Sequence, residues 1–335
     1  MSGLSSSPSW LTSYTEVIDS RIANHLGPGS SELSIAVREA LRGGKRIRAV
    51  LALLWCEAVS GRYEPAVPVA VAYEMAHAAA LVQDDILDDS GFRRGERSVI
   101  GKHGLRLAIL ASNMLLAQVP SEIAEYVSLD ADGNTIRRLF DLLGESFAAA
   151  ILGESLDLEM SQRDSVTESD YEYMIKLKTG ALVAAASTSG AIVAGGKEAE
   201  SVVRAAYEFG ELLGMAYQIQ DDLLDVTGDE TTLGKPAFAD IRGGKRNIVV
   251  IHALAESSGE DRLFLKGIVA RKGDLRDWEI ARARDLLSRR SNVDYVHGVS
   301  TKYAERARAL LEMPGLGASK TKLLELSDYI TSRKY

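Results

Sequence analysis

The sequence predicts an all-α fold, a single-domain bundle of about ten or more helices. Prolines are few, and none occurs between Pro120 and Pro236. Apolar residues recur three and four positions apart, as in Tyr207 to Val226, which is the period of a helix that packs on one face. Strand-like alternation and hairpin turns are scarce. No stretch has the composition of a linker, so residues 1–335 are expected to form one domain.

Breaks rich in Gly, Pro and Ser divide the chain into helices of about 15 to 25 residues. These breaks fall at 27–30, 61–62, 91–97, 161–169, 228–244, 259–260 and 314–317. The segment 129–134 is expected to connect two helices, although it contains Asp132-Gly133. Residues 1–12 are Ser-rich and are expected to be flexible. They lack the basic start and apolar core of a signal peptide, so none is expected.

The composition is that of a soluble globular protein, with 46% hydrophobic and 26% charged residues. A net charge of −8 argues against nucleic-acid binding. The single cysteine, Cys56, excludes an internal disulfide and a Cys-rich zinc site, and is expected in the core. The most apolar stretch, 181–196, is broken by Ser and Thr and is too short to span a membrane. We therefore expect a cytoplasmic protein without a transmembrane segment.

Two acidic clusters of the same design stand in otherwise apolar, helix-forming stretches. Each places carboxylates at positions i, i+1 and i+4, so its first and last Asp lie about 40° apart on one helical face. A single such cluster is typical of a solvated helix face, but two with apolar flanks indicate a site that needs cations. Hard carboxylate oxygens without Cys or His suit Mg²⁺. The candidate metal ligands are Asp84, Asp85, Asp88, Asp221, Asp222 and Asp225.

Basic residues on glycine-containing turns accompany the carboxylates. Arg93 and Arg94 follow the first acidic cluster, and Lys45 and Arg48 follow the pair Gly43-Gly44. Guanidinium groups bind phosphate through two parallel hydrogen bonds, and glycine loops let backbone amides approach an anion. Each basic cluster alone is typical of solvated surface. Together with the carboxylates they indicate a substrate that carries a diphosphate.

Taken in chain order, these motifs resemble the trans-isoprenyl diphosphate synthases, also called polyprenyl synthetases. The resemblance runs from Gly43 to about Ile248, with a further similarity at 329–335. It implies the isoprenoid synthase fold, in which helices surround a central cavity, and a homodimer. Its remaining motifs are Glu74 with His77, Lys178-Thr179-Gly180, Tyr217-Gln218, and Gly234-Lys235-Pro236 continued by Asp240 and Lys245.

The resemblance implies head-to-tail condensation of isopentenyl diphosphate with an allylic diphosphate, releasing diphosphate. Three Mg²⁺ ions, held chiefly by Asp84, Asp88 and Asp221, would bind the allylic diphosphate. The other residues have three implied roles. Lys178, Lys235 and Arg93 would stabilise the departing diphosphate, with Lys245 in the same substrate-binding loop; Thr179 and Gln218 would lie near the allylic cation; and Lys45, Arg48, His77 and Arg94 would bind isopentenyl diphosphate.

Five positions depart from the family pattern. Ala49 replaces a proline, Glu154 replaces a glutamine and Asn247 replaces a threonine, while Arg97 and Ile100 lie where Pro and His are common. None of these departures removes a metal ligand or a phosphate contact. They weaken any transfer of product specificity.

Small residues before the first acidic cluster bear on product length. In this family the floor of the product tunnel lies one or more turns before that cluster. Ala79, Ala80 and Ala76 are small, and Tyr73 is the first bulky residue near the same face. It lies eleven residues before Asp84, roughly 16 Å along a helix, which favours a product near C20. The competing hypothesis places the stop at Met114 or Leu115 of the next helix.

Two other functions share some of these features. A class I terpene cyclase has an α-helical fold and an Asp-rich metal motif, but it would need neither the basic residues at 43–48 nor His77. An accessory subunit of a heteromeric prenyl synthase commonly loses one acidic motif, whereas both are intact here. An elongating synthase is therefore the preferred interpretation.

Overall fold

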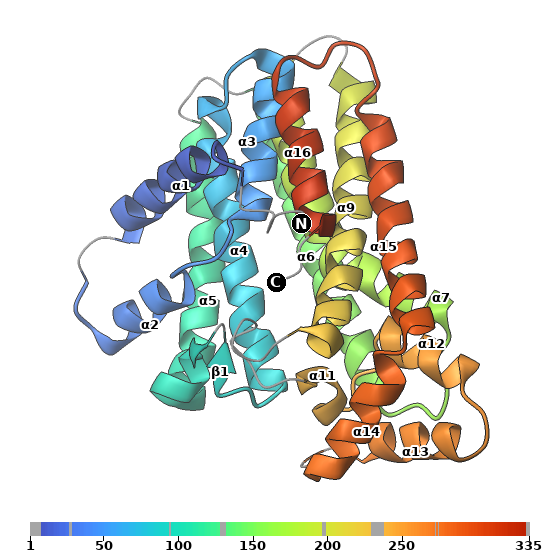
Figure 1. Ribbon diagram of the computed structural model, residues 1–335. Coiled ribbons are helices and arrows are strands. Elements are labelled where there is room, and N and C mark those ends of the chain that lie inside the picture. Colours follow the sequence, from blue (N-terminus) through green and yellow to red (C-terminus); the bar gives the residue numbers. More distant parts are fainter. Residues whose placement is uncertain are drawn as a thin grey trace.

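The computed structural model describes residues 8–26, 29–93, 95–127, 132–195, 199–228, 238–271, 273 and 275–332. These residues are mostly helical, which confirms the predicted all-α class (Figure 1). The long helices are α1 (Leu11–Leu26), α3 (Ile47–Ser60), α4 (Val67–Leu87), α5 (Val99–Val127), α6 (Gly133–Met160), α8 (Ala181–Ala194), α9 (Ala199–Thr227), α15 (Arg290–Leu310) and α16 (Ser319–Ser332). The shorter ones are α2 (Glu32–Ala40), η1 (Glu64–Ala66), α7 (Glu168–Ile175), η2 (Lys176–Gly180), α11 (Ala239–Arg242), α12 (Ile248–Glu256), α13 (Gly259–Ala270) and α14 (Asp277–Leu287).

Helix α8 is the centre of the bundle. Every residue from Ala181 to Val193 is buried, and α8 packs against α3, α4, α6 and α9. A Cβ atom at Gly190 would overlap the carbonyl of Ala52 on α3, and one at Gly210 of α9 would overlap the backbone of α8. Glycine therefore sets the close approach of α8 to its two neighbours.

The strands in the described part of the chain form one short hairpin after α4. Strand β1 (Phe92–Arg93) pairs antiparallel with β2 (Glu96–Arg97). Gly95 has a φ of 78°, which a glycine adopts without strain. The hairpin turns Arg93 back toward the end of α4.

Helical structure starts earlier than expected at the beginning of the chain, and the single cysteine lies in the core. Helix α1 begins at Leu11, inside the segment expected to be flexible, because Leu11 and Tyr14 are buried against the bundle. Residues 1–7 lie outside the described residues. Cys56 is buried in α3, as expected.

Three helical runs are long and apolar enough to cross a membrane by length and composition alone. They are Glu64–Leu87, Val99–Tyr126 and Glu168–Ala194, and 72%, 39% and 83% of their most apolar windows are buried inside the protein. The expectation of no membrane-spanning segment rested on the stretch 181–196 alone and did not include these three runs. Burial in the bundle accounts for the apolarity of the first and third runs, whereas the second, within α5, is largely uncovered.

Candidate active site

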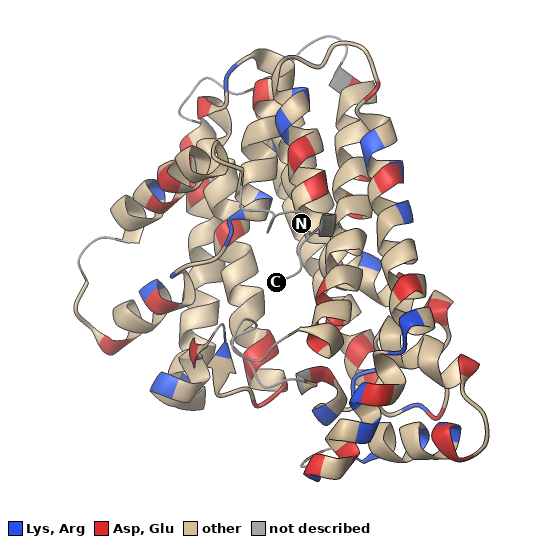
Figure 2. Cartoon of the chain, in the orientation of Figure 1, with Lys and Arg blue, Asp and Glu red and all other residues tan. Residues whose placement is uncertain are grey.

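The first acidic motif forms the last turn of α4, and the second forms the last turns of α9. Figure 2 shows charged residues gathered near α11 at this end of the bundle, and further charged residues along α15 and α16. Asp88 caps α4, and its amide donates to the carbonyl of Asp84 at 2.9 Å. The helical spacing therefore places both carboxylates on the same face, as predicted.

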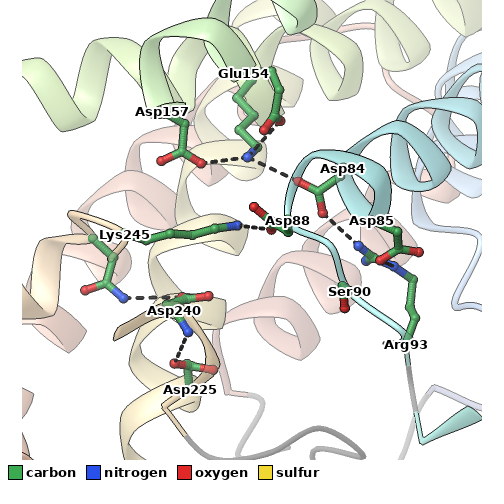
Figure 3. A network of polar contacts seen from close by, with 12 residues as sticks. Asp84, Asp85, Asp88, Ser90, Arg93, Glu154, Asp157, Asp225, Asp240 and Lys245 are labelled. Atoms are coloured by element: carbon green, nitrogen blue, oxygen red, sulfur yellow. Dashed lines mark hydrogen bonds and ion pairs between the residues drawn. The ribbon is translucent and has the colours of Figure 1, made fainter. Parts of the chain in front are cut away.

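Arg93 is held by two carboxylates of the first motif. Its Nη2 lies 2.7 Å from Oδ2 of Asp84, and its Nε lies 2.8 Å from Oδ1 of Asp85 (Figure 3). The hairpin is fixed in turn by Ser98, whose Oγ donates to the carbonyl of Ser90 at 2.6 Å. Arg94 lies outside the described residues.

Lys178 lies among three carboxylates from two helices. Its Nζ is 3.4 Å from Oδ1 of Asp84, 2.8 Å from Oε2 of Glu154 and 2.7 Å from Oδ2 of Asp157. Lys178 belongs to a π-helical turn, a form that occurs mostly as single turns and often at functional sites. A Cβ atom at Gly153 would overlap the backbone of Lys178. Glycine at this position of α6 therefore lets the π turn approach its carboxylates.

Lys245 joins the two acidic motifs. Its Nζ lies 2.6 Å from Oδ2 of Asp88, at the end of α4. Its amide donates to the carbonyl of Asp240 at 2.8 Å, and the amide of Asp240 donates to Oδ2 of Asp225 at 3.3 Å. Asp225 of the second motif thus anchors the turn that delivers Lys245 to the first motif (Figure 3). Lys235, the other predicted lysine of this loop, lies outside the described residues.

A second hydrogen-bonded chain lies on the α9 side. Oη of Tyr171 donates to Oδ2 of Asp222 at 2.6 Å, and Nε2 of Gln218 donates to Oδ1 of Asp222 at 2.8 Å. Oγ1 of Thr179 donates to Oε1 of Gln218 at 2.9 Å. Asp222 is buried and engaged in this chain, whereas Asp221 is half-buried one turn before Asp225. Thr179 and Gln218, predicted to act together, are therefore in contact.

Neighbouring charges and burial give Asp84 and Asp85 of the first motif different pKa values. Burial raises the pKa of Asp84, but the neighbouring Lys178, Lys245 and Arg93 outweigh it and hold that pKa well below its usual range. Burial raises the pKa of Asp85 to about 6, with Arg93 opposing the rise. Asp84 is therefore more firmly ionised than Asp85 near neutral pH.

The donor set suits a hard cation. Five carboxylates, those of Asp84, Asp85, Asp88, Glu154 and Asp157, share the three cations Arg93, Lys178 and Lys245. The excess is negative, and the ligands are oxygens, which Mg²⁺ prefers. Among the described residues, no three acidic, His or Cys groups already converge as a preformed metal site. The aspartates are instead held by their basic neighbours.

The glycine loop lines a pocket of about 360 Å³ beside this cluster. Arg48 and His77 line it together with Lys45, and apolar side chains from α8 and α9 close its other side. Gly43 and Gly44 have φ values of 69° and 99°, which only glycine adopts without strain. The structure thus brings three of the four residues predicted to bind isopentenyl diphosphate around one cavity.

Arg46, which sequence reasoning left without a role, anchors this loop. Its guanidinium is buried, with Nε 2.9 Å from Oδ1 of Asp19 and Nη1 3.4 Å from Oε2 of Glu74. The amide of Ala49 also donates to Glu74, at 3.3 Å. A proline at 49 has no amide hydrogen, so the departure at Ala49 adds a hydrogen bond.

The four chain-length residues lie on α4, behind the acidic motif. Tyr73, Ala76 and Ala79 are fully buried and Ala80 is half-buried. The competing candidates differ from each other: Leu115 is fully buried on α5, whereas Met114 is 39% exposed. Leu115 therefore remains a candidate for an internal stop, and Met114 lies on the outer surface of the chain.

The chain is similar to known proteins over nearly its whole length. The Polyprenyl synthetase family profile matches residues 30–286. The chain belongs to the polyprenyl synthetase family. It is 36% identical to the short chain isoprenyl diphosphate synthase of Methanothermobacter thermautotrophicus, over 97% of this chain and 98% of that protein.

Solved structures of synthetases of this family have the same fold. Geranylgeranyl pyrophosphate synthetase of Pyrococcus horikoshii aligns with a TM-score of 0.87 and 30% identity, over 97% of each chain. A geranylgeranyl pyrophosphate synthase of Corynebacterium glutamicum, solved with isoprenyl diphosphate and magnesium, aligns with a TM-score of 0.82 and 25% identity, over 96% of this chain and 98% of that one. The isoprenoid synthase fold expected from the sequence is thereby confirmed.

Two of the family departures have defined contacts in this polyprenyl synthetase. Glu154 contacts Lys178, and burial raises the pKa of its carboxyl. Asn247 caps α12 by accepting from the amide of Val250 at 3.1 Å, and its side chain donates to Asp240 at 3.3 Å. Asn247 therefore supports the turn that carries Lys245.

Proposed function

We propose that the chain condenses isopentenyl diphosphate head-to-tail with an allylic diphosphate, releasing diphosphate, to give a product of about C20. One observation carries this proposal: Asp225 of the second acidic motif anchors the turn whose Lys245 reaches Asp88 of the first. Both acidic motifs and both described lysines thus serve one site. The pocket beside it is basic and large enough for a second, smaller substrate.

The allylic diphosphate is bound through Mg²⁺, three ions in all, held chiefly by Asp84, Asp88 and Asp221. The excess of carboxylates over cations supports this assignment, as does the magnesium in the similar Corynebacterium structure. When bound, the ions withdraw charge from the diphosphate oxygens as Lewis acids. Asp85 and Asp222 position the site through Arg93 and Gln218.

Basic side chains stabilise the departing diphosphate. Lys178, Lys245 and Arg93 already lie on carboxylates of the first motif, so a bound diphosphate exchanges one set of anionic oxygens for another. Fixed cations aimed at a developing charge lower the barrier because they need no reorganisation during the reaction. Lys235 is proposed to join them. Thr179 and Gln218, linked by their hydrogen bond, border the allylic cation.

Isopentenyl diphosphate binds in the pocket lined by the glycine loop. Lys45, Arg48 and His77 supply its donors there, and Arg94 is proposed to complete the set. The buried Arg46 fixes the loop from behind, through ion pairs with Asp19 and Glu74. The diphosphate released in the reaction takes the final proton, so no side-chain base is assigned.

Product length is set behind the acidic motif. Tyr73 lies on the inner side of α4, fully buried, eleven residues before Asp84. A separation of roughly 16 Å along the helix accommodates a chain near C20. The Pyrococcus relative, named for a C20 product, supports the same length.

A homodimer is proposed, with α5 and α6 forming the interface. Both helices expose large apolar side chains on their outer faces, 38–54% exposed: Leu105, Ile109, Leu110, Met114, Phe140, Ile151 and Leu152. Exposed large apolar side chains gathered on two helices that contact each other mark an interaction surface. A second copy fits it, because the same face on each partner is self-complementary about a two-fold axis.

The remaining parts of the proposal concern location. The three apolar helical runs are assigned to the bundle core and the dimer face, so we propose that no segment spans a membrane. A cytoplasmic location is proposed because the single cysteine suits a reducing compartment. The net charge of −8 supports the absence of a nucleic-acid partner.

A terpene cyclase or an accessory subunit is less well supported. A cyclase binds one diphosphate, and the pocket with Arg48 and His77 would then have no ligand. An accessory subunit would not need Lys178 and Lys245 beside an intact first motif.

Elongation of labelled isopentenyl diphosphate tests the proposal. Purified protein is incubated with Mg²⁺ and, separately, with C5, C10 and C15 allylic diphosphates, and products are separated by chain length. Label is expected in products that end near C20. Release of diphosphate with cyclic hydrocarbon and no incorporation of label would support the cyclase instead, and no turnover with any starter would exclude the synthase.

A further inference from the structure

Three buried side chains with hydroxyl groups, from three helices, form a polar cluster at the level of Tyr73, called the relay below. Oγ of Ser189, on α8, donates to Oη of Tyr73, on α4, at 2.9 Å. Burial raises the pKa of Tyr73, and the hydroxyls of Ser189 and of Ser146, on α6, oppose that rise. Oγ of Ser146 donates its own hydrogen to the carbonyl of Leu143 at 3.0 Å. All three side chains are at most 5% exposed.

The relay lies at a fixed distance from the ionic cluster, which consists of Asp84, Asp157 and Lys178. On each of the three chain segments, eleven residues separate a member of the relay from a member of the cluster, which is roughly 16 Å for a helix. Three helical segments therefore share the same two polar ends. The pairs are Tyr73 and Asp84, Ser146 and Asp157, and Ser189 and Lys178.

Small side chains predominate between the two ends. On the helical positions that join them lie Ala76 and Ala80 of α4, Ala150 and Gly153 of α6, and Ala181 and Ala185 of α8. An isoprenoid tail anchored by its diphosphate at the ionic end therefore meets no bulky residue on α4 until Tyr73. A fifth prenyl unit needs the space of that ring, and moving the ring breaks the buried hydrogen bond from Ser189, which is costly without water to replace it.

We propose that Ser189 and Ser146 are specificity-determining residues: their relay with Tyr73 holds its ring across the end of the product channel and limits elongation near C20. This inference rests on the proposed prenyl transfer and deepens it. The ring supplies the obstruction, and the serines supply the force that keeps it in place. Bulk at position 73 is therefore insufficient by itself.

Product analysis of three variants tests the relay. Ser189→Ala and Tyr73→Phe remove the hydrogen bond to the ring, and Ser146→Ala removes the third hydroxyl of the relay, while all three keep the ring. We expect each to raise the ratio of C25 to C20 product, by roughly tenfold, the usual discrimination for a small change in an apolar pocket. Tyr73→Ala should raise it further. The control is Ser187→Ala, also buried on α8, whose hydroxyl only donates to its own helix at Val183 and which should leave the ratio unchanged.

Two results would overturn the relay as the determinant. Unchanged ratios in both serine variants, with longer products from Tyr73→Ala, would assign the stop to ring bulk alone. Longer products from Leu115→Ala but not from Tyr73→Ala would move the stop to α5.

A double-mutant cycle of thermal stability tests the hydrogen bond between Tyr73 and Ser189 without relying on catalysis. Tyr73→Phe and Ser189→Ala are combined, and thermal unfolding is measured for each single variant and the pair. If the two side chains are hydrogen-bonded, the double variant should lose less stability than the sum of the losses in the two single variants. Strictly additive losses of stability would refute the hydrogen bond. A wild-type protein that elongates no starter would refute the proposed function, while this cycle would still report on the bond.

Discussion

Nζ of Lys245 lies 2.6 Å from Oδ2 of Asp88, across 157 positions of the sequence. The pair links the turn after α11 to the end of α4. Lys178 makes the equivalent contact one turn earlier, with Asp84 at 3.4 Å. Two lysines from separate segments therefore flank the first acidic motif, and each has a carboxylate that a diphosphate can replace.

Loss of Lys245 should impair chemistry more than folding. Lys245→Gln removes a fixed cation from the leaving diphosphate, and we expect kcat to fall by about 10²–10³-fold, as for loss of one transition-state donor. Lys266→Gln, on the exposed face of α13, is the matched control and should keep full activity. Steady-state kinetics check this. Equal kcat values for the two variants would show that Lys245 is dispensable.

Asp84 should be essential for Mg²⁺-dependent turnover. Asp84→Asn removes the carboxylate whose pKa the surrounding cations hold well below its usual range, so both the charge and a metal ligand are lost. Turnover should vanish while the circular dichroism of the helices persists. Asp89→Asn, next to the motif and exposed, keeps the left-handed φ of 49° that Asn tolerates, and should behave as wild type. Full activity of Asp84→Asn at saturating Mg²⁺ would remove Asp84 from the site.

Gly153→Ala should displace Lys178. The added Cβ overlaps the backbone of Lys178, so α6 and the π turn must separate, at a cost of about 1–3 kcal/mol of folding free energy. Activity should fall together with stability. Gly298→Ala, midway along α15 with nothing near the new Cβ, should be neutral or stabilising. Chemical unfolding measures both, and equal stability for the two variants would show that the close approach is unnecessary.

Stability should depend on the ionisation of Glu57. Burial raises the pKa of this carboxyl, but hydrogen bonds from Ser319, Tyr14 and Lys322 outweigh it and lower the pKa below 4.5. A carboxyl with a lowered pKa in the folded state stabilises the protein above the unfolded pKa, and the effect is lost as pH falls through the folded value. Glu57→Gln should therefore lose about 2 kcal/mol at pH 7.

The loss from Glu57→Gln should shrink as the pH falls below about 4.5, where the unfolded chain takes up the proton, and it should vanish below the lowered pKa of the folded protein. Other carboxyls titrate in the same range, so the difference between wild type and variant is the informative quantity. A difference that stays constant from pH 7 to pH 3.5 would contradict the assignment.

A single charge introduced into the exposed apolar face of α5 should dissociate the proposed dimer. Ile109→Arg places a cation within the exposed apolar face of α5 and should convert a dimer to a monomer in light scattering. Leu263→Arg, on α13, alters a side chain that is 72% exposed but lies outside that face, and should leave the dimer intact. A monomeric wild type, or dimers in both variants, would exclude this interface.

Local spacing made part of the site predictable. Asp84 and Asp88 are on one helical face because of the period of the helix, and Arg93 returns to them because Gly95 allows a tight turn. The all-α fold class was also predictable, because apolar residues recur three and four positions apart. These features depend on residues that are close together in the sequence.

Contacts between distant segments were not predictable from the sequence. Glu154 and Asp157 reach Lys178 only because Gly153 lets α6 pack against the π turn. Arg46 belongs to the basic cluster at 43–48 and could bind substrate by its charge, yet its side chain is turned inward to Glu74. The choice between a surface and a buried role depends on packing, which a basic cluster in a sequence does not encode.

Binding of the two diphosphates to separate parts of one cleft is the central claim, and equilibrium dialysis tests it most directly. Labelled isopentenyl diphosphate and a non-cleavable allylic diphosphate analogue are each titrated, with Mg²⁺, against wild type, Asp84→Asn and Arg48→Ala. We expect wild type to bind both ligands together, Asp84→Asn to lose only the allylic analogue, and Arg48→Ala to lose only isopentenyl diphosphate. Mutual displacement of the two ligands from wild type, at one site per chain, would contradict the account.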